Sequence, residues 1–219
     1  MTSTRIITLG PNDIDRVVDL EVCTFDPTIQ ASRDTILKRL ALGHIMIGLE
    51  DAGQLAGAVA MSYGRFDPAD QSSFPTSEKE LSLQSVPAAF NAAYIYSRGI
   101  HPAYQGRGYS KLLVNTAWTW AKDAGCAYVV GNPRTASYAG SDPNSSCENI
   151  PPRPRFKAAI DRYLAGGPYP SLDELLEDPS LLYFSHLPGA TFHWIIPGFA
   201  PHDMASGGIR IIVYARLTE

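Results

Sequence analysis

The sequence IHPAYQGRGYSKLL, residues 100–113, decides the fold, because a strand end, a glycine-containing loop and a helix start follow one another within it. The run YIYSRGI, residues 94–100, has the β-branched and aromatic content of a strand. Gly106 and Gly108 permit left-handed backbone conformations and a close approach of the main chain to a ligand. Apolar residues at helical spacing then predict a helix from about 108 to 124.

The loop between this strand and this helix has the properties of a local anion-binding site. The first N–H groups of a helix have no partner within the helix, and the helix dipole favours a negative charge beside them. Arg107 and Lys111 add positive charge, and no Asp or Glu occurs from Leu81 to Lys122, although the whole chain has a formal charge of −4. A dinucleotide fingerprint needs three spaced glycines and an acid about 20 residues later, and a P-loop needs Gly-Lys-Ser/Thr; neither pattern is present here.

Length and composition limit the remaining possibilities. With 219 residues, of which 45% are hydrophobic, the chain is long enough for one substantial core, and we expect a single domain over 1–219. The net acidity argues against a nucleic-acid partner or an anionic membrane held by bulk electrostatics. Three widely spaced cysteines suit neither zinc nor a disulfide framework, and no signal peptide or membrane span is visible, so we expect a cytoplasmic protein.

Periodicity in the rest of the chain predicts an α/β fold. The order before residue 64 is strand, helix, helix, strand, strand, at 5–9, 14–25, 32–42 and on either side of the turn at 51–54. The buried strand CAYVVG at 126–131 follows the helix, and we expect it to pair in parallel with 94–100. Further helices are expected at 156–164, 171–177 and 180–187, before two terminal strands, with long connections at about 64–91 and 132–168.

Residues 100–113 closely resemble the acyl-CoA loop of the GNAT superfamily of acetyltransferases. That loop has an aliphatic residue, any residue and Pro, then Gln or Arg, two residues, Gly, any residue, and Gly or Ala. Ile100, Pro102, Gln105 and Gly108 match this pattern, and Ser110 stands where Gly or Ala is usual. The resemblance implies the GNAT fold, a central mixed twisted sheet flanked by helices, in which two splayed parallel strands form the acyl-CoA wedge.

The same resemblance implies the residues that hold the CoA moiety. The main chain at the end of the first splayed strand would bond the pantetheine amides, and the N–H groups of the loop would hold the pyrophosphate. The implied binding residues are Ser97, Arg98, Gly99, Ile100, Gln105, Gly106, Arg107, Gly108, Tyr109, Ser110 and Asn132. The co-substrate would be acetyl-CoA or another acyl-CoA, with no metal.

The C-terminal half resembles a narrower group, the GNAT domains that stand alone or are fused to nitrilase-like amidohydrolases. In that group the second splayed strand is followed by an Arg-containing segment that ends in Tyr, as in residues 131–138 of this chain. Weaker patterns at 178–189 and 196–203 are also similar. Where the group often has His or another polar residue after a Phe, this chain has Ser185 followed by His186.

Direct acyl transfer needs a base for the acceptor amine and an acid for the leaving thiolate. Many GNAT enzymes place a carboxylate on the strand before the loop, but residues 94–100 contain none. We therefore expect that no single carboxylate acts as an essential base. The candidates for the catalytic acid are Tyr138, Tyr183 and His186.

Three residues are candidates for binding the acceptor, namely Glu21, Tyr96 and Arg134. Glu21 ends the first helix, where the alternative is a solvated helix residue. Arg134 follows a buried strand and could hold a carboxylate of the acceptor or form a structural salt bridge. Strict alternation along the strand would separate its side chains into two sets, with Tyr94, Tyr96 and Arg98 on one face and Ile95, Ser97 and Gly99 on the other.

Three functions agree with these features. The first is N-acyl transfer from acetyl-CoA or a similar acyl-CoA to a small-molecule amine, with the long connections at 64–91 and 132–168 bordering the acceptor pocket. The second keeps the fold but changes the reaction to decarboxylation, thioester hydrolysis or carbon–carbon bond formation. The third is a non-catalytic acyl-CoA-binding module. The oligomeric state is open between a monomer and a homodimer.

Overall fold

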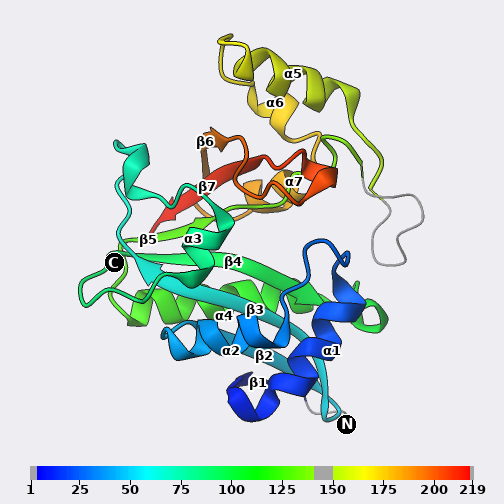
Figure 1. The fold of residues 1–219 in the computed structure, drawn as a ribbon, viewed down its shortest axis with the longest axis vertical. Helices are drawn as coiled ribbons and strands as arrows, with labels where there is room; N and C mark the ends of the chain where they lie inside the picture. Colours follow the sequence, from blue (N-terminus) through cyan, green and yellow to red (C-terminus); the bar gives the residue numbers. More distant parts are fainter. Residues whose placement is uncertain (1–3, 141–149, 218–219) are drawn as a thin grey trace. The chain divides into compact units, whose positions relative to one another are not determined.

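The computed structural model describes residues 4–140 and 150–217. The chain divides into two compact units, Met1–Gly131 together with Leu217–Glu219, and Asn132–Arg216. Figure 1 labels the helices and strands of both. The part of the long 132–168 connection from 141 to 149 lies outside the described residues, and the single domain over 1–219 stays a prediction.

The first unit is built on a mixed sheet with the strand order β1-β2-β3-β4-β5. Its strands are β1 (Thr4–Thr8), β2 (Ile45–Asp51), β3 (Gln54–Gly64), β4 (Ala92–Ile100) and β5 (Tyr128–Gly131). Neighbouring strands pair antiparallel except β4 and β5, which are parallel. The parallel pair confirms the expected strand–loop–helix–strand unit, because β5 returns beside β4 after helix α4 (Tyr109–Asp123).

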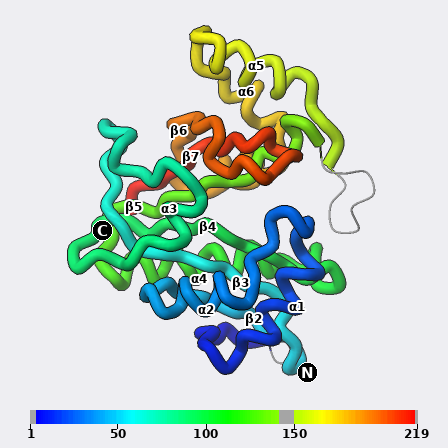
Figure 2. The backbone as a smooth tube through the Cα atoms, viewed as in Figure 1, coloured from blue at the N-terminus to red at the C-terminus, as the bar shows by residue number. Residues whose placement is uncertain are grey.

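Helices cover both faces of this sheet. Helices α1 (Ile14–Thr24) and α2 (Arg33–Ala41) pack on one face, where Leu20 and Ile36 belong to one buried cluster with Ala58 of β3. Helix α4 packs on the other face, in a second cluster. The tube in Figure 2 follows the chain from the blue N-terminal helices to the green α4.

The connection between β3 and β4 carries a short helix, α3 (Glu78–Leu83), and a 3₁₀ turn, Gln71–Ser73. Further 3₁₀ turns lie at Pro11–Asp13 and Pro102–Tyr104. The side chain of Ser77 accepts a hydrogen bond from the N–H of Glu80, which caps α3 and explains why a polar, proline-rich segment still forms a helix.

A β-bulge on β4 changes which side chains share a face. The register shifts so that Ala60 pairs with Ser97 while Met61 pairs with Ile95, which leaves Tyr96 as an extra residue. The strict alternation expected from the sequence is therefore wrong. Tyr96 packs in the cluster under α1 and α2, and Ser97 lines a cavity on the same side of the sheet.

The second unit contains two antiparallel strands, β6 (Thr191–Ile196) and β7 (Arg210–Arg216). Its helices are α5 (Pro154–Leu164), α6 (Leu172–Leu175) and α7 (Pro179–Ser185), with a 3₁₀ turn at Met204–Ser206. Apolar side chains from the helices and strands form its core, including Phe156, Ile160, Leu181, Ile195 and Ile211.

The expected elements are found in the described residues, with small differences at their ends. The strand, helix, helix, strand, strand order and the α/β class with a mixed, helix-flanked sheet are confirmed. The helix expected at 156–164 starts earlier, because Pro154 occupies its first turn, where proline is favoured. The capping box at Ser171 is present, but helix α6 ends at Leu175.

Candidate functional site

The loop between β4 and α4 has an open backbone with two left-handed glycines. Gly106 and Gly108 have φ angles of +76° and +78°, in the left-handed region that favours glycine. A Cβ atom placed on either residue would meet no atom within 4 Å. The main chain is thus not shielded by neighbouring side chains, and a ligand can approach it closely.

The start of α4 points unsatisfied donors at this opening. Gly108 occupies the N-cap position and has no side chain to cap the helix. The first N–H groups of Tyr109 and Ser110 have no partner within a helix of this kind. Together with the positive end of the helix dipole, these donors form a site suited to phosphate oxygens.

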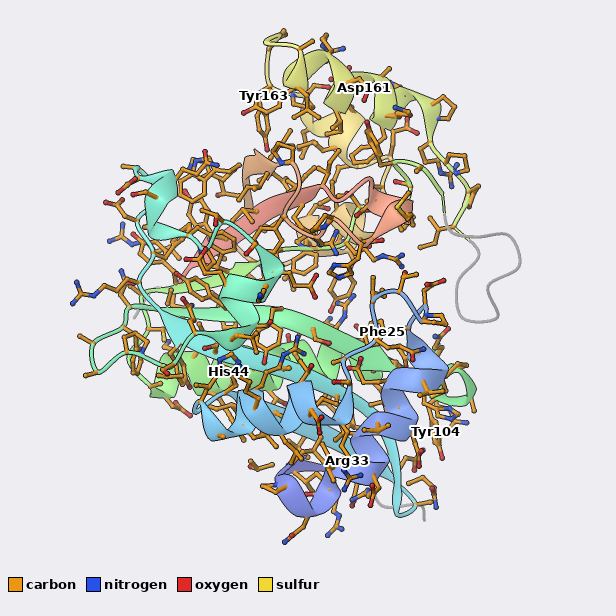
Figure 3. The ribbon with its side chains drawn as sticks, in the orientation of Figure 1. Phe25, Arg33, His44, Tyr104, Asp161 and Tyr163 are labelled. Carbon is orange, nitrogen blue, oxygen red and sulfur yellow. The ribbon has the colours of Figure 1, made fainter. Side chains whose placement is uncertain are left out.

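Arg107 is held by a carboxylate from another strand. Its Nη1 donates to Oδ2 of Asp51 across 3.1 Å, and the hydroxyl of Tyr109 donates to the same oxygen across 2.8 Å. The Arg107 guanidinium also lies 4.9 Å from the centre of the Tyr104 ring, which Figure 3 labels. The acid-free stretch of sequence around the loop is therefore not an acid-free environment, because Asp51 at the end of β2 reaches it.

The edge of β4 beside the loop is unpaired on its β5 side. The parallel ladder between β4 and β5 ends with Ile95 opposite Gly131, whereas the ladder to β3 continues to Ile100. The two strands therefore separate after Ile95, as the resemblance implies for the acyl-CoA wedge. Within the described residues, the backbone of Tyr96 to Gly99 faces no strand on that side, and the carbonyl oxygen of Ile100 accepts a hydrogen bond from Nε2 of Gln105 across 3.4 Å.

A small cavity lies between α1 and the sheet. Its volume is about 10 Å³, which is roughly the space of a single water molecule. Apolar side chains form most of the wall, and the lining includes Leu20, Glu21, Phe25, Ala60, Ser97 and Gly99. The cavity thus reaches the same stretch of β4 that borders the wedge.

Glu21 is the ionisable group of this lining. The residue is only 9% exposed, so its reading as a solvated helix residue is wrong. Burial raises the pKa of the Glu21 carboxyl, the N–H of Ala31 and the charge of Arg39 lower it, and the charge of Glu78 raises it further. The Ala31 N–H donates to Oε2 of Glu21 across 3.0 Å, which fixes the carboxyl in place.

Tyr96 is fixed by a buried histidine. The Tyr96 hydroxyl lies 2.8 Å from Nδ1 of His44, and Nε2 of His44 lies 2.9 Å from the carbonyl oxygen of Gln84. A carbonyl only accepts, so Nε2 carries the proton. Burial lowers the pKa of His44, which favours the neutral ring, and Nδ1 then accepts the Tyr96 proton. Tyr96 itself has its pKa raised to about 12 by burial and stays a neutral phenol.

The remaining candidates lie in the second unit. Asn132 is buried at its start. The Tyr138 hydroxyl donates to Asp161, and Lys157 donates to the same hydroxyl across 3.3 Å. Burial and the Asp161 hydrogen bond raise the pKa of Tyr138.

Two further acid candidates lie at the end of α7. Tyr183 is partly buried, and His186 is exposed immediately after the helix.

Arg134 forms a structural ion pair. Its Nε donates to both carboxylate oxygens of Asp203, at 3.0 and 2.9 Å. Arg210 pairs with the same carboxylate at 2.8 Å. Asp203 has no exposed surface, so this cluster ties the start of the second unit to its last loop. Of the two roles considered for Arg134, the structure shows the salt bridge.

Asp178 and Asp203 belong to the patterns at 178–189 and 196–203 that resemble the narrower GNAT group, but the sequence assigned neither of them a catalytic or binding role. Asp178 caps α7 through the N–H groups of Ser180 and Leu181 and accepts from the Ser137 hydroxyl. Its neighbour Pro179 in an Asp-Pro helix start was the available signal. Both carboxylates are saturated with protein partners, which indicates structural roles.

The described ranges contain neither a metal-binding cluster nor a membrane-spanning helix. Within 4–140 and 150–217, no three His, Cys, Asp or Glu residues gather in a way that could hold a metal ion. None of the helices in these ranges combines the length and the hydropathy that crossing a bilayer requires.

Comparisons with known proteins agree with this geometry. Residues 14–139 match the model of the acetyltransferase (GNAT) family. No curated protein sequence matches the chain significantly. Among solved structures, the GphF GNAT-like decarboxylase in complex with isobutyryl-CoA has a TM-score of 0.73 and 24% identity, over 98% of this chain and 100% of that one.

Two further structures show the same fold. The loading GNATL domain of CurA from Lyngbya majuscula has a TM-score of 0.71 and 19% identity, over 98% of each chain. The ribosomal-protein-S18-alanine N-acetyltransferase from Escherichia coli has a TM-score of 0.56 and 13% identity, over 99% of this chain and 96% of that one. Because the family match alone spans more than half of the sequence, the chain belongs to the GNAT family of acetyltransferases.

Proposed function

We propose that the protein is a cytoplasmic enzyme that transfers an acyl group, in the first place acetyl, from acyl-CoA to the amine of a small molecule. One observation carries this proposal, namely that the left-handed glycines, the uncapped start of α4 and the unpaired edge of β4 occur at one place. Support comes from the family description and from the isobutyryl-CoA named for a similar structure.

The CoA moiety suits the residues of this site. Its pyrophosphate would accept hydrogen bonds from the N–H groups of Gln105 to Ser110, where the open space at Gly106 and Gly108 admits a bulky anion. The amides of its pantetheine arm would pair with the backbone of Ser97 to Ile100, much as a further strand would. The side chain of Arg107 contributes less charge than its type suggests, because Asp51 neutralises it.

The reaction forms one bond and breaks one bond at the thioester carbonyl. The amine nitrogen attacks the carbonyl carbon with its lone pair, and the carbonyl oxygen becomes negative. The C–S bond then breaks and its electron pair leaves on sulfur. The attacking nitrogen loses a proton to water, and the thiolate takes a proton from an acid.

Glu21 and Tyr96 are the acceptor-binding residues of this proposal. Glu21 borders the cavity beside Ser97 and Gly99, where its carboxyl would meet the amine of the acceptor. Tyr96 presents a hydroxyl whose proton is engaged by His44, so that its oxygen accepts a further hydrogen bond. Tyr138, Tyr183 and His186 stay the candidates for the acid that protonates the thiolate.

A second reaction on the same fold is favoured by one comparison. The similar structure with a TM-score of 0.73 is described as a decarboxylase, and β4 of this chain lacks the carboxylate that many family members use as a base. The alternative is that the protein decarboxylates or hydrolyses an acyl-CoA, or forms a carbon–carbon bond, without acylating an amine.

Incubation with acyl-CoA separates these functions. The full chain would be incubated with acetyl-CoA or malonyl-CoA and a panel of amines, while free thiol and product masses are followed. Free thiol together with an acylated amine supports N-acyl transfer. Free thiol without acylated amine indicates hydrolysis or carbon–carbon bond formation, which the product mass distinguishes. Loss of CO₂ with an intact thioester indicates decarboxylation, and binding without any product indicates a non-catalytic module.

A further inference from the structure

Arg39 of α2 is a buried arginine that forms no ion pair with any residue the structure describes. The residue is 7% exposed, and its Nε is fully buried without a hydrogen-bond partner. Within 4–140 and 150–217, no Asp or Glu lies within ion-pair distance of its guanidinium, which stacks over the ring of Tyr96 at 5.2 Å from the ring centre. The same helix also carries Arg33, an exposed residue that pairs with Asp15 (Figure 3).

This burial is costly unless something compensates for it. A guanidinium has five N–H donors, and buried charges in proteins are normally paired. The cation–π contact with Tyr96 offsets only part of the cost of removing the charge from water. A ligand that brings a negative charge to Arg39 would supply the missing compensation.

The surroundings of Arg39 form a rigid receptor. The hydroxyl of Tyr96 is held by His44, which is held in turn by Gln84, so the ring under the guanidinium has a fixed position. Arg39 packs in α2, whose start is capped by the side chain of Ser32. An aromatic ring held in place in this way positions the face on which the guanidinium stacks.

Arg39 belongs to the same side of the sheet as the cavity under α1. Its charge acts on Glu21, which lines that cavity together with Ser97 and Gly99 of β4. Glu21 and Arg39 are close enough to influence each other, yet they form no salt bridge. Arg39 also stacks on Tyr96, which directly precedes Ser97 of the cavity lining.

Resting on the proposed function, we propose that Arg39 binds a carboxylate carried by the substrate beside the cavity under α1. The planar guanidinium matches a carboxylate with two parallel hydrogen bonds. The carboxylate belongs either to the acyl group, as in a dicarboxylic acyl-CoA, or to the acceptor, as in an amino acid. Both sources present the same chemistry to Arg39.

Matched ligands test the proposal and distinguish its two sources. Calorimetry would compare malonyl-CoA with acetyl-CoA, which lacks the carboxylate, and would compare glycine with glycinamide in the presence of saturating CoA. The proteins are the unaltered full chain, Arg39→Gln, Arg39→Lys and the control Arg33→Gln, which removes the same charge from the exposed side of the same helix.

We expect a selective loss of affinity for a ligand that carries a carboxylate. Arg39→Gln weakens binding of either malonyl-CoA or glycine by roughly 10- to 100-fold, which is the effect of a charged hydrogen bond. Binding of the matched ligand without the carboxylate, acetyl-CoA or glycinamide, stays unchanged. Arg39→Lys has an intermediate effect, because it keeps the charge without the planar fork. Arg33→Gln behaves as the unaltered protein does. The affected pair identifies the source of the carboxylate.

The proposal is overturned if Arg39→Gln affects both members of each pair equally, or if the unaltered protein never prefers the carboxylate. Free malonate provides a test that does not depend on CoA. It should raise the thermal midpoint of the unaltered protein and of Arg33→Gln, but not that of Arg39→Gln. If acetyl-CoA fails to bind while this malonate effect is present, the proposed function is wrong and the Arg39 site stands.

Discussion

Asp51 and Arg107 meet although 56 residues separate them in the sequence, with Nη1 of Arg107 donating to Oδ2 of Asp51 across 3.1 Å. Asp51 is almost fully buried, whereas the side chain of Arg107 is 51% exposed. The carboxylate therefore belongs to the protein interior, whereas the arginine side chain that binds it is half in solvent. Since Tyr109 binds the same oxygen, Asp51 attaches both sides of Gly108 to the end of β2.

This arrangement predicts a weak energetic coupling between the side chains of Asp51 and Arg107. It also predicts that the free energy of unfolding depends strongly on Asp51. In a double-mutant cycle of Asp51→Asn and Arg107→Gln, urea unfolding should give a coupling of about 0.2–1 kcal/mol, because the half-exposed guanidinium keeps the pair in contact with water. Asp51→Asn alone should cost more than Arg107→Gln alone, because it also weakens the Tyr109 hydrogen bond. Equal single effects would show that Asp51 has no role beyond the ion pair.

Gly108→Asp should abolish or severely weaken CoA binding. The change puts a side chain and a negative charge into the open space at the start of α4, where the pyrophosphate would lie. Gly125→Asp is a matched control, because Gly125 has the same φ of +78°, is equally open, and follows the other end of the same helix. Calorimetry with CoA should separate the two variants, while circular dichroism reports similar folding. Equal affinities would refute the assignment of the loop.

Asp203→Asn should strongly destabilise the protein. Burial raises the pKa of the Asp203 carboxyl, but the hydrogen bond from Arg134 and the charges of both arginines outweigh it, so the pKa lies below its usual value. Removing the charge leaves two arginines without their counter-ion, at a cost of about 3–5 kcal/mol. The exposed pair of Lys157 and Asp161 provides the control, since Asp161→Asn should cost less than about 1 kcal/mol.

The ion pair between Asp203 and Arg134 also predicts how the stability of the protein depends on pH. An acid whose pKa is depressed in the folded state stabilises the fold above its unfolded pKa of about 3.8, and this contribution is lost as the pH falls through the lower, folded value. Denaturation followed between pH 7 and pH 2 should therefore show a steep acid loss in the unaltered protein. A similarly steep loss in Asp203→Asn would assign the effect to other groups.

The sequence predicted the order of the elements and the loop well, because these depend on local patterns. Glycine positions, the apolar periodicity of α4 and the turn at 51–54 are each readable within a few residues. The caps of α2 by Ser32 and of α6 by Ser171 are local in the same sense, because each serine lies directly before the helix that it caps. These features need no knowledge of what lies across the sheet.

What the sequence could not show depends on contacts between distant residues. The bulge at Tyr96 arises from pairing with β3, and periodicity alone assigned its neighbours to the wrong faces. Glu21 looked like a solvated residue because its burial comes from the segment around Ala31, which folds back over it. Likewise, Asp203 lies 69 residues from Arg134, and no local pattern links them.

Glu21→Gln should stabilise the folded protein at neutral pH. Since the pKa of Glu21 is raised mainly by burial, its stabilising neutral form is fully present below about pH 4.5 and is lost as the pH rises through the folded pKa. Glutamine keeps the neutral shape and still accepts the Ala31 hydrogen bond. Thermal unfolding should therefore show a higher midpoint for Glu21→Gln at pH 7 and no difference near pH 4.

Glu50, a buried glutamate whose pKa is lowered instead of raised, is the control for this measurement. Glu50 pairs with Arg16 and Arg5, and these hydrogen bonds lower its pKa. Glu50→Gln should therefore lower the midpoint at pH 7. If both variants shift the midpoint in the same direction, burial is not what distinguishes Glu21.

Glu21→Gln should also leave the pH dependence of acyl transfer almost unchanged. No carboxylate lies on β4, so the acceptor amine arrives neutral or loses its proton through water, and a protonated amine cannot attack the thioester. With a lysine-like acceptor of pKa about 10.4, kcat/KM should rise across neutral pH and level off only near the pKa of the amine.

Because Glu21 binds the acceptor in the proposed function, its loss should act mainly on KM, with kcat reduced less than about tenfold. A general base contributes about 100-fold or more. Steady-state rates from pH 6 to 10.5 decide the matter: if kcat collapses in Glu21→Gln while CoA still binds, Glu21 is the base and the water route is wrong.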